Sequence, residues 1–237
     1  MIPKIIHYCW FGRGPMPELA LKCIESWHRF MPDYEYKLWN EDSFDVSSTP
    51  YTAEAYQAKR YAFVSDVVRL KALSEQGGIY FDVDFEVYKP FDDLLSYRAF
   101  AGFEGSKHNP VMMGVIASEP GGEWVTEQLV AYTGRHFIID GKEDLMTNVQ
   151  FISDQMEKGG FVPNGLDQDY KDLHVFPVEF FCPHLTTGEY RRTNNTYCEH
   201  KGTHSSWAKK TLKGRILDLF SPNFRTKMIL VKRKLIG

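Results

Sequence analysis

Cysteine is scarce in this chain of 237 residues, and the few cysteines present lie far apart. No two of them form a C-x-x-C pair, which argues against a structural zinc site. A reduced, intracellular setting is the simpler expectation for thiols used in this way. The four positions are Cys9, Cys23, Cys182 and Cys198.

Long hydrophobic runs, internal repeats, low-complexity tracts and linkers are also missing from the sequence. The apolar start, MIPKIIHYCWFG, is too short for a signal peptide or a membrane span. It contains His7 and a single lysine, and we expect it to form a first strand. The length of the chain suits one domain that can bury a substantial core.

The net charge of -3 conceals a strong asymmetry between the two ends of the chain. Residues 207–237 contain nine lysines and arginines and one acid, a formal charge of +8, which leaves -11 for residues 1–206. We therefore expect a domain over 1–206 and a basic, amphipathic helical tail over 207–237. The tail either lies on an anionic membrane surface or packs on the domain as a solvated helix. Its apolar side would be formed by Leu212, Ile216, Leu219 and Phe220.

Apolar periodicity predicts strands and helices that alternate along the chain. The continuous apolar run Ile5–Phe11 is typical of a strand buried on both faces. The order of elements predicts one α/β domain, Rossmann-like, with a largely parallel central sheet. In such sheets ligands bind beyond the C-terminal ends of the strands. The expected strands are 5–11, 34–38, the segment after Gly78, 99–103, 111–118, 174–176 and 196–200, and the expected helices are 20–31, 61–76, 123–132 and 145–158.

The most informative segment is Gly77–Asp84, GGIYFDVD. The two glycines predict the end of a helix through a left-handed cap, and the strand after them carries Asp82 and Asp84. Because side chains alternate along a strand, both carboxylates are expected to point the same way at its C-terminal end. Such a pair suits a hard divalent ion, Mg²⁺ or Mn²⁺, which commonly neutralises a phosphate ester or diphosphate. The alternative is a solvated acidic turn.

The preceding helix, 61–76, is unusually apolar but carries Asp66 and Arg69 on one face. Charges on the apolar face of a buried helix need a partner or a function. One interpretation is an ion pair that satisfies itself. The other is a ligand site beside Asp82 and Asp84, in which the arginine contacts phosphate or sugar and the aspartate accepts sugar hydroxyls.

Taken together, these motifs resemble the DXD-type sugar-nucleotide glycosyltransferases of family 32. That family includes bacterial capsular-polysaccharide and lipopolysaccharide sugar transferases and the fungal initiating mannosyltransferases, and its core is shared more distantly with the clostridial glucosylating toxins. The similarity is dense over Ile2–Leu95 and then thin until Thr196–Trp207. The matching elements are the opening IPKIIHYCWFG, Ser65-Asp66-x-x-Arg69, Gly77-Gly78-x-Tyr80 and Asp82-x-Asp84.

The resemblance implies a GT-A-type domain that binds a nucleotide sugar. Trp10, at the end of the first strand, would stack on the nucleobase, for which core packing is the alternative. Ser65, Asp66 and Arg69 would contact the donor, the last two holding its sugar and phosphate. Tyr80 would pack under the site.

The resemblance also implies a metal cofactor, Mn²⁺ or Mg²⁺. Asp84 would ligate the ion directly, and Asp82 would do so through water or touch the ribose and sugar. A third ligand is expected from a histidine ahead of a Ser-Trp pair. The segment TYCEH is similar to the family's T-Y-x-x-H and favours His200, with His204 as the second choice, because the stretch that follows is one residue longer than usual. The Ser-Trp pair, which would reach the diphosphate, is Ser206 and Trp207. The expected catalytic residues are Asp66, Arg69 and Asp82.

The implied reaction is a retaining transfer of a sugar from a nucleotide-diphosphate donor, UDP-linked in preference to GDP-linked, to a saccharide or lipid-linked saccharide. Attack on the same face as departure is favoured, because no carboxylate nucleophile is evident. Asn148 and Gln150 either approach the far side of the sugar or are surface amides. The acceptor is expected over 109–132 and 159–187. We expect a cytoplasmic enzyme of surface polysaccharide or glycolipid synthesis, peripheral on the membrane through its tail.

Two other functions are compatible with parts of the sequence. A metal-dependent phosphatase or phosphotransferase could use the Asp82-x-Asp84 pair, although such enzymes place it on the first strand and have Thr or Val where this chain has Glu86. A non-catalytic nucleotide-sugar-binding module would leave the aspartates and Arg69 without a purpose. Nucleic-acid binding is not expected, because the basic tail lacks interleaved aromatic residues.

Overall fold

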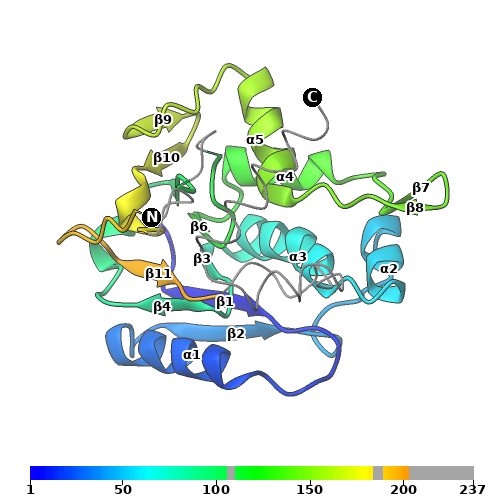
Figure 1. Ribbon diagram of the computed structural model, residues 1–237, viewed down its shortest axis with the longest axis horizontal. Coiled ribbons are helices and arrows are strands. Elements are labelled where there is room, and N and C mark those ends of the chain that lie inside the picture. Colours follow the sequence, from blue (N-terminus) through cyan, green and yellow to red (C-terminus); the bar gives the residue numbers. More distant parts are fainter. Residues whose placement is uncertain (106–109, 184–188, 203–237) are drawn as a thin grey trace, which may run out of the picture. The chain divides into compact units, whose positions relative to one another are not determined.

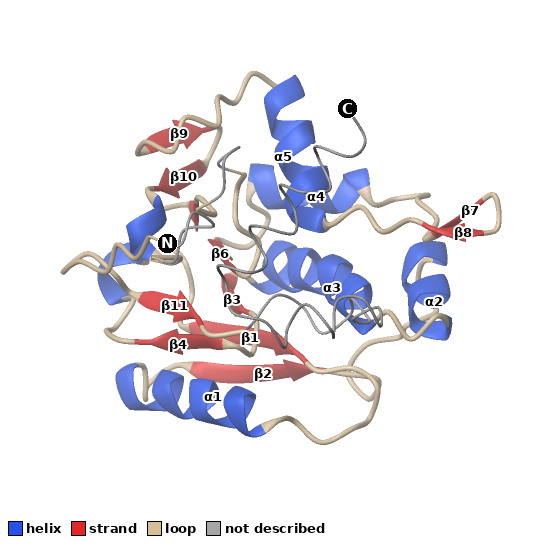
Figure 2. Ribbon diagram, in the orientation of Figure 1, coloured by secondary structure: helices blue, strands red, loops and turns tan. Residues whose placement is uncertain are grey.

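Seven strands form one central sheet in the computed structural model, which describes residues 1–105, 110–183 and 189–202 (Figures 1 and 2). Their order is β2-β1-β3-β6-β5-β10-β9. β1 is parallel to β2 and β3, and β5 is parallel to β10. Only β6 and β9 run against their neighbours, so five of the seven strands share one direction. The predicted α/β domain with a largely parallel sheet is confirmed. The strands are β1 (Ile5–Cys9), β2 (Glu35–Trp39), β3 (Gly78–Phe81), β5 (Ala99–Gly102), β6 (Val115–Ser118), β9 (Gln168–Tyr170) and β10 (Leu173–Phe176).

Helices cover the sheet, and two small antiparallel sheets lie outside it. β4 (Phe85–Val87) pairs with β11 (Cys198–His200), and β7 (Ile138–Ile139) pairs with β8 (Lys142–Glu143). The β4–β11 pairing brings a late segment of the chain next to the segment that follows β3. The helices are α1 (Glu18–Phe30), α2 (Pro50–Gln57), α3 (Tyr61–Gln76), α4 (Glu123–Ala131) and α5 (Asn148–Lys158).

The three strands β3, β5 and β6 are buried at every position, and their residues are almost all apolar, as expected where both faces of a sheet are covered. On one face, Tyr80 of β3 packs in a cluster with residues of α3 and α4. On the other face, Ile79 and Phe81 pack with Trp27 of α1. Helices α1 and α3 accordingly lie on opposite sides of β1 in Figure 2.

Trp27 connects α1 to the region where the aspartates lie. Its ring stacks on Phe81 with 5.2 Å between centroids, and its indole N–H donates to the carbonyl of Phe85 at 2.7 Å. The side chain is fully buried. One end of β4 is therefore held directly against the core at the point where β3 ends.

Most predicted elements are present, with several changes of boundary. α3 spans 61–76 as expected, and Gly77 and Gly78 end it with positive φ angles of 64° and 106°. α5 begins at Asn148, three residues later than expected, and only 115–118 of the predicted strand 111–118 is regular. α2, β4, β7, β8 and β9 were not predicted from the sequence.

One geometric prediction about the aspartates is wrong. β3 ends at Phe81, so Asp82–Asp84 form a turn into β4 and do not alternate on a strand. The peptide N–H of Asp82 still donates to the Gly114 carbonyl, but the Phe85 N–H turns back to the Asp82 carbonyl at 3.2 Å. The two carboxylates are consequently oriented by their individual partners.

The expected boundary at 206/207 and the basic tail 207–237 lie outside the described residues. Among the residues that are described, the structure contains no helix with the length and apolar character needed to cross a bilayer.

Candidate donor and metal site

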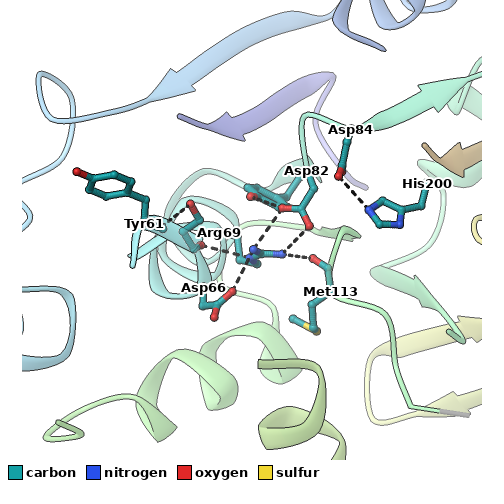
Figure 3. A network of polar contacts seen from close by, with 9 residues as sticks. Tyr61, Asp66, Arg69, Asp82, Asp84, Met113 and His200 are labelled. Carbon is teal, nitrogen blue, oxygen red and sulfur yellow. Dashed lines mark hydrogen bonds and ion pairs between the residues drawn. The ribbon is translucent and has the colours of Figure 1, made fainter. Parts of the chain in front are cut away.

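Asp82 and Asp84 lie at the C-terminal edge of the parallel strands β1 and β3, where an α/β sheet binds its ligands. Each carboxylate has its own set of partners (Figure 3). Asp82 accepts a hydrogen bond from the Tyr80 hydroxyl at 2.8 Å and pairs with Arg69 at 3.3 Å. Tyr80 therefore does more than pack beneath the site, because it also orients Asp82.

Arg69 is the centre of the polar network. Its side chain is 5% exposed, and each guanidinium nitrogen donates to a protein oxygen. The guanidinium also lies over the Tyr80 ring, 4.5 Å from the ring centroid. A buried arginine with this many acceptors is fixed in place, and it fixes the groups around it in turn. The acceptors are the Ser65 carbonyl, the Met113 carbonyl, Asp66 and Asp82.

Asp66 shares a helix face with Arg69, as its spacing predicted. One oxygen lies 3.1 Å from the Arg69 guanidinium, and the residue is buried. The other oxygen has no partner in the described part of the chain. Burial raises the pKa of Asp66 to about 7, even though the charge of Arg69 lowers it. Asp66 can thus accept a ligand hydroxyl through its second oxygen.

Asp84 meets His200 across 116 positions of sequence. The imidazole Nε2 lies 3.0 Å from one carboxylate oxygen of Asp84. The antiparallel pairing of β4 with β11 sets this contact, because it places His200 opposite Phe85. Burial lowers the pKa of His200, but the hydrogen bond and negative charge of Asp84 outweigh burial and raise it above its usual value.

The second oxygen of Asp84 is buried and has no hydrogen-bond partner among the described residues. Gly202 passes so close that a Cβ there would lie 2.1 Å from the first oxygen. An unpaired buried carboxylate oxygen is costly, and it is normally paired or bound to a cation. One carboxylate and one imidazole nitrogen form a donor set that suits a divalent ion.

The described residues contain no group of three or more His, Cys, Asp or Glu side chains placed to hold a metal ion. The pair Asp84 and His200 is nevertheless compatible with such an ion, because a free carboxylate oxygen adjoins an imidazole. Asp82 is already engaged by Arg69 and Tyr80. Direct coordination is therefore better matched to Asp84 than to Asp82.

Two of the remaining predicted donor contacts, Trp10 and Ser65, lie among the described residues. Trp10 directly follows β1 and is partly buried, and its indole N–H donates to the Gly14 carbonyl at 2.7 Å. Ser65 lies one residue before Asp66 on α3 and bonds to the Tyr61 carbonyl. The predicted residues His204, Ser206 and Trp207 lie outside the described residues.

Several groups around this site could not be predicted from the sequence. The Met113 carbonyl contacts Arg69, and main-chain contacts of this kind leave no trace in residue types. The two amides on α5, for which a surface position was one of two expectations, differ in burial. Asn148 is 6% exposed and its amide nitrogen has no partner among the described residues, whereas Gln150 is exposed and donates to Asp154.

Comparisons with known proteins point in the same direction as the geometry. Residues 17–101 match the family model described as the glycosyltransferase sugar-binding region containing a DXD motif. This span includes α3 and the turn with Asp82 and Asp84. Most of the dense resemblance inferred from the motifs thus coincides with a DXD glycosyltransferase region.

Two curated relatives share 37% identity with parts of the chain. Inositol phosphoceramide mannosyltransferase 3 of Schizosaccharomyces pombe aligns over 42% of this chain and 29% of its own length. Glucan organizing enzyme 1 of Cryptococcus neoformans var. grubii aligns over 56% of this chain and 44% of its own length. The chain thus spans less than half the length of these relatives.

Among solved structures, the chain aligns with the PaToxG glycosyltransferase at 20% identity and a TM-score of 0.45. The alignment covers 54% of this chain and 59% of that one.

Proposed function

We propose that this protein is a metal-dependent, retaining glycosyltransferase of the GT-A type. It would move a sugar from a nucleoside-diphosphate donor to a hydroxyl of a saccharide or glycolipid acceptor. The observation that carries the proposal is the pairing of Asp84 with His200. This pair presents a buried, unpartnered carboxylate oxygen at the ligand-binding edge of the sheet, beside a turn that matches the DXD region.

Asp84 and His200 would hold Mn²⁺ or Mg²⁺, with Asp82 oriented behind them by Arg69 and Tyr80. When bound, the ion would neutralise the charge that develops on the leaving diphosphate. The protein's own contribution is positional. Because Arg69 ties α3 to Asp82 of the DXD turn and to the Met113 carbonyl, these groups are already positioned before the donor arrives.

The donor would extend along the same edge of the sheet. Trp10 would stack on the base, and the free oxygen of Asp66 would accept a hydrogen bond from a sugar hydroxyl. We favour attack by the acceptor on the face from which the diphosphate departs, which retains configuration. Ser206 and Trp207 remain predicted diphosphate contacts.

Donor and acceptor identity belong to the same proposal. A UDP-sugar is our first candidate and a GDP-sugar the second, and the name of the Schizosaccharomyces pombe relative adds mannose to the sugars worth testing. We propose acceptors of surface polysaccharide or glycolipid synthesis, with the chain located in the cytoplasm and its basic residues 207–237 at an anionic membrane surface.

Thermal shift with UDP, GDP and inorganic phosphate, each with and without Mn²⁺, tests the donor class. Saturation at 100 times the dissociation constant stabilises by about 2.7 kcal/mol, which should raise Tm by roughly 5–10 °C in a domain of this size. We expect this shift with a nucleoside diphosphate only when Mn²⁺ is present. Stabilisation by phosphate alone would favour the phosphatase, and no response to either diphosphate would refute the transferase.

The substitution Asp84→Ala should abolish the Mn²⁺-dependent shift and lower the rate of donor hydrolysis at least about 100-fold, because it removes the metal-holding carboxylate. The chain contains a matched control in Asp169. This aspartate also belongs to a D-x-D sequence and contacts a histidine, His174, at 2.7 Å, but it lies on the edge strand β9. Asp169→Ala should leave both measurements unchanged. Full turnover in Asp84→Ala would show that the ion is held elsewhere.

A further inference from the structure

A cluster of aromatic rings encloses one arginine near Asp66. Tyr51 comes from α2, Tyr132 and Arg135 follow α4, and Phe151 lies on α5. The Arg135 guanidinium lies 3.8 Å from the Phe151 ring centroid, 5.0 Å from that of Tyr132 and 5.1 Å from that of Tyr51. Three separate segments of the chain therefore converge on this one side chain.

The segment that carries Arg135 is tied to two helices. Glu54 of α2 accepts hydrogen bonds from the Ile138 N–H at 2.8 Å and from His136 at 2.7 Å. Arg60, just before α3, forms an ion pair with Glu143 of β8. These contacts hold the segment against α2 and the start of α3, so Arg135 has a defined position.

Two polar atoms in this cluster are buried without a hydrogen-bond partner among the described residues. They are the Tyr51 hydroxyl and one terminal nitrogen of Arg135, Nη1. Tyr51 is only 1% exposed. The other terminal nitrogen of Arg135 is held by Asp144 at 2.7 Å. Buried donors without acceptors are uncommon and costly, so two in one cluster indicate that a ligand supplies the acceptor.

Tyr51 and Tyr132 pack in one core cluster with Val67 of α3, the residue next to Asp66. The aromatic cluster around Arg135 therefore lies beside the helix that carries Asp66, within electrostatic reach of its carboxylate. Burial raises the pKa of Tyr51, and the negative charge of Asp66 raises it further, while Arg135 lowers it. Arg135 likewise acts with Arg69 to lower the pKa of Asp66 against the effect of burial. The free oxygen of Asp66 and the two unpaired donors therefore belong to one neighbourhood.

We propose that Tyr51 and Arg135 bind the sugar of the nucleotide-sugar donor together with Asp66, and that they set which sugar is accepted. This inference rests on the proposed function. A sugar hydroxyl both donates and accepts hydrogen bonds, so it can donate to the carboxylate of Asp66 while it accepts from a phenol or guanidinium. Nothing in the sequence pattern pointed to either residue.

The charges of the neighbourhood favour a neutral sugar over an acidic one. Arg135 is paired with Asp144, and Arg69 is paired with both Asp66 and Asp82. Two cations thus face three carboxylates. A uronic acid would add a further negative charge close to Asp66, whereas an uncharged hexose adds none.

Titration calorimetry of the full chain with Mn²⁺ tests the proposal, using UDP-glucose, UDP-glucuronate, GDP-mannose, UDP and GDP as ligands. Tyr51→Phe removes only the hydroxyl, and Arg135→Lys retains a charge for Asp144 but not the second nitrogen. Each should weaken binding of the accepted neutral nucleotide sugar about tenfold and leave binding of the matching diphosphate within about twofold. UDP-glucuronate should bind more weakly than UDP-glucose.

Tyr34→Phe is the matched control, because the Tyr34 hydroxyl is also buried without a partner among the described residues but belongs to the cluster on the other face of the sheet. Tyr34→Phe should change neither the affinity for the nucleotide sugar nor that for the matching diphosphate. An equal loss of diphosphate and sugar affinity in Tyr51→Phe would mean a structural role and overturn the inference, as would unchanged sugar affinity. A wild-type chain that binds no diphosphate and no nucleotide sugar would instead overturn the proposed function, and this inference with it.

Discussion

At the scale of single residues, His7 connects the first strand to the junction between α3 and β3, the strand that leads into the DXD turn. It is fully buried, and the indole N–H of Trp39 donates to its Nδ1 at 3.0 Å. Nε2 lies 2.9 Å from the Gly77 carbonyl, to which it donates. Both contacts are satisfied only by the neutral ring protonated at Nε2. Burial accordingly lowers the pKa of His7 to about 4.

This lowered pKa predicts a loss of stability in mild acid. Between about pH 6.5 and pH 4 the unfolded chain binds a proton at His7 that the folded chain does not. The contribution of neutral His7 to the free energy of unfolding is therefore complete above this range and is lost as the pH falls through it. The free energy of unfolding should decrease by about 2 kcal/mol between pH 7 and pH 5 because of His7. Urea unfolding at both pH values measures it, with His7→Gln as the non-titrating comparison. The same pH dependence in both proteins would contradict this role.

Asp66 and Arg69 show what local spacing can and cannot predict about a residue. A separation of three on an apolar helix correctly predicted a shared buried face, and the ion pair, one of the two interpretations left open, is present. The contacts of Arg69 with Asp82 and the Met113 carbonyl depend on how β3 and the segment before β6 pack on α3. Tyr51 and Arg135 were missed for the same reason, since only the folded chain brings α2 and the segment after α4 to Asp66.

At the scale of elements, the junction between α3 and β3 determines where the DXD turn lies. Gly78 begins β3 with a φ of 106°, beside the parallel strand β1. A Cβ at this position would lie 2.5 Å from the Ile5 carbonyl oxygen, which is backbone and cannot move aside cheaply. The close approach of α3, β3 and β1 therefore requires glycine here.

Gly78→Ala should destabilise the fold by about 3 kcal/mol or more, because left-handed strain adds to a clash with backbone. Gly121→Ala separates the two effects. Gly121 also has a positive φ, 68°, but a Cβ there would meet no atom within 4 Å, so strain alone should cost about 1 kcal/mol. Urea midpoints of the two variants test the difference. Equal costs would show that β1 and β3 can separate to accept a methyl group.

The elements that sequence reasoning identified are those with long or uniform patterns. α3 has sixteen residues, and β1 is apolar except for His7, so both were predicted at nearly their observed bounds. β4 and β9 have three residues each, too few for a periodicity to emerge. Because β4 was missed, Asp82 and Asp84 were placed on a strand. The approach of His200 to Asp84 requires the β4–β11 pairing, and only the family resemblance suggested it.

At the scale of the whole molecule, formal charge is distributed unevenly along the chain. Residues 207–237 carry +8, while residues 1–206 carry -11. Each basic residue near an anionic bilayer contributes about 1 kcal/mol, and the attraction weakens as salt rises. We therefore expect the basic segment to attract the chain to a negative surface that the acidic remainder avoids, which would bring the proposed donor site close to the proposed lipid-linked acceptors.

Flotation with liposomes provides the test of this charge distribution. The full chain should float with vesicles containing phosphatidylserine at 0.1 M salt, and it should float less at 0.5 M salt or with neutral vesicles. Replacing Lys232, Arg233 and Lys234 by glutamine should weaken binding about 100-fold, since three cationic contacts are lost. The matched control replaces Lys22, Arg29 and Lys158 by glutamine. This variant changes the net charge by the same amount but outside the basic segment. If both triple variants lose the same affinity, total charge rather than its location governs the interaction, and membrane association through residues 207–237 is wrong.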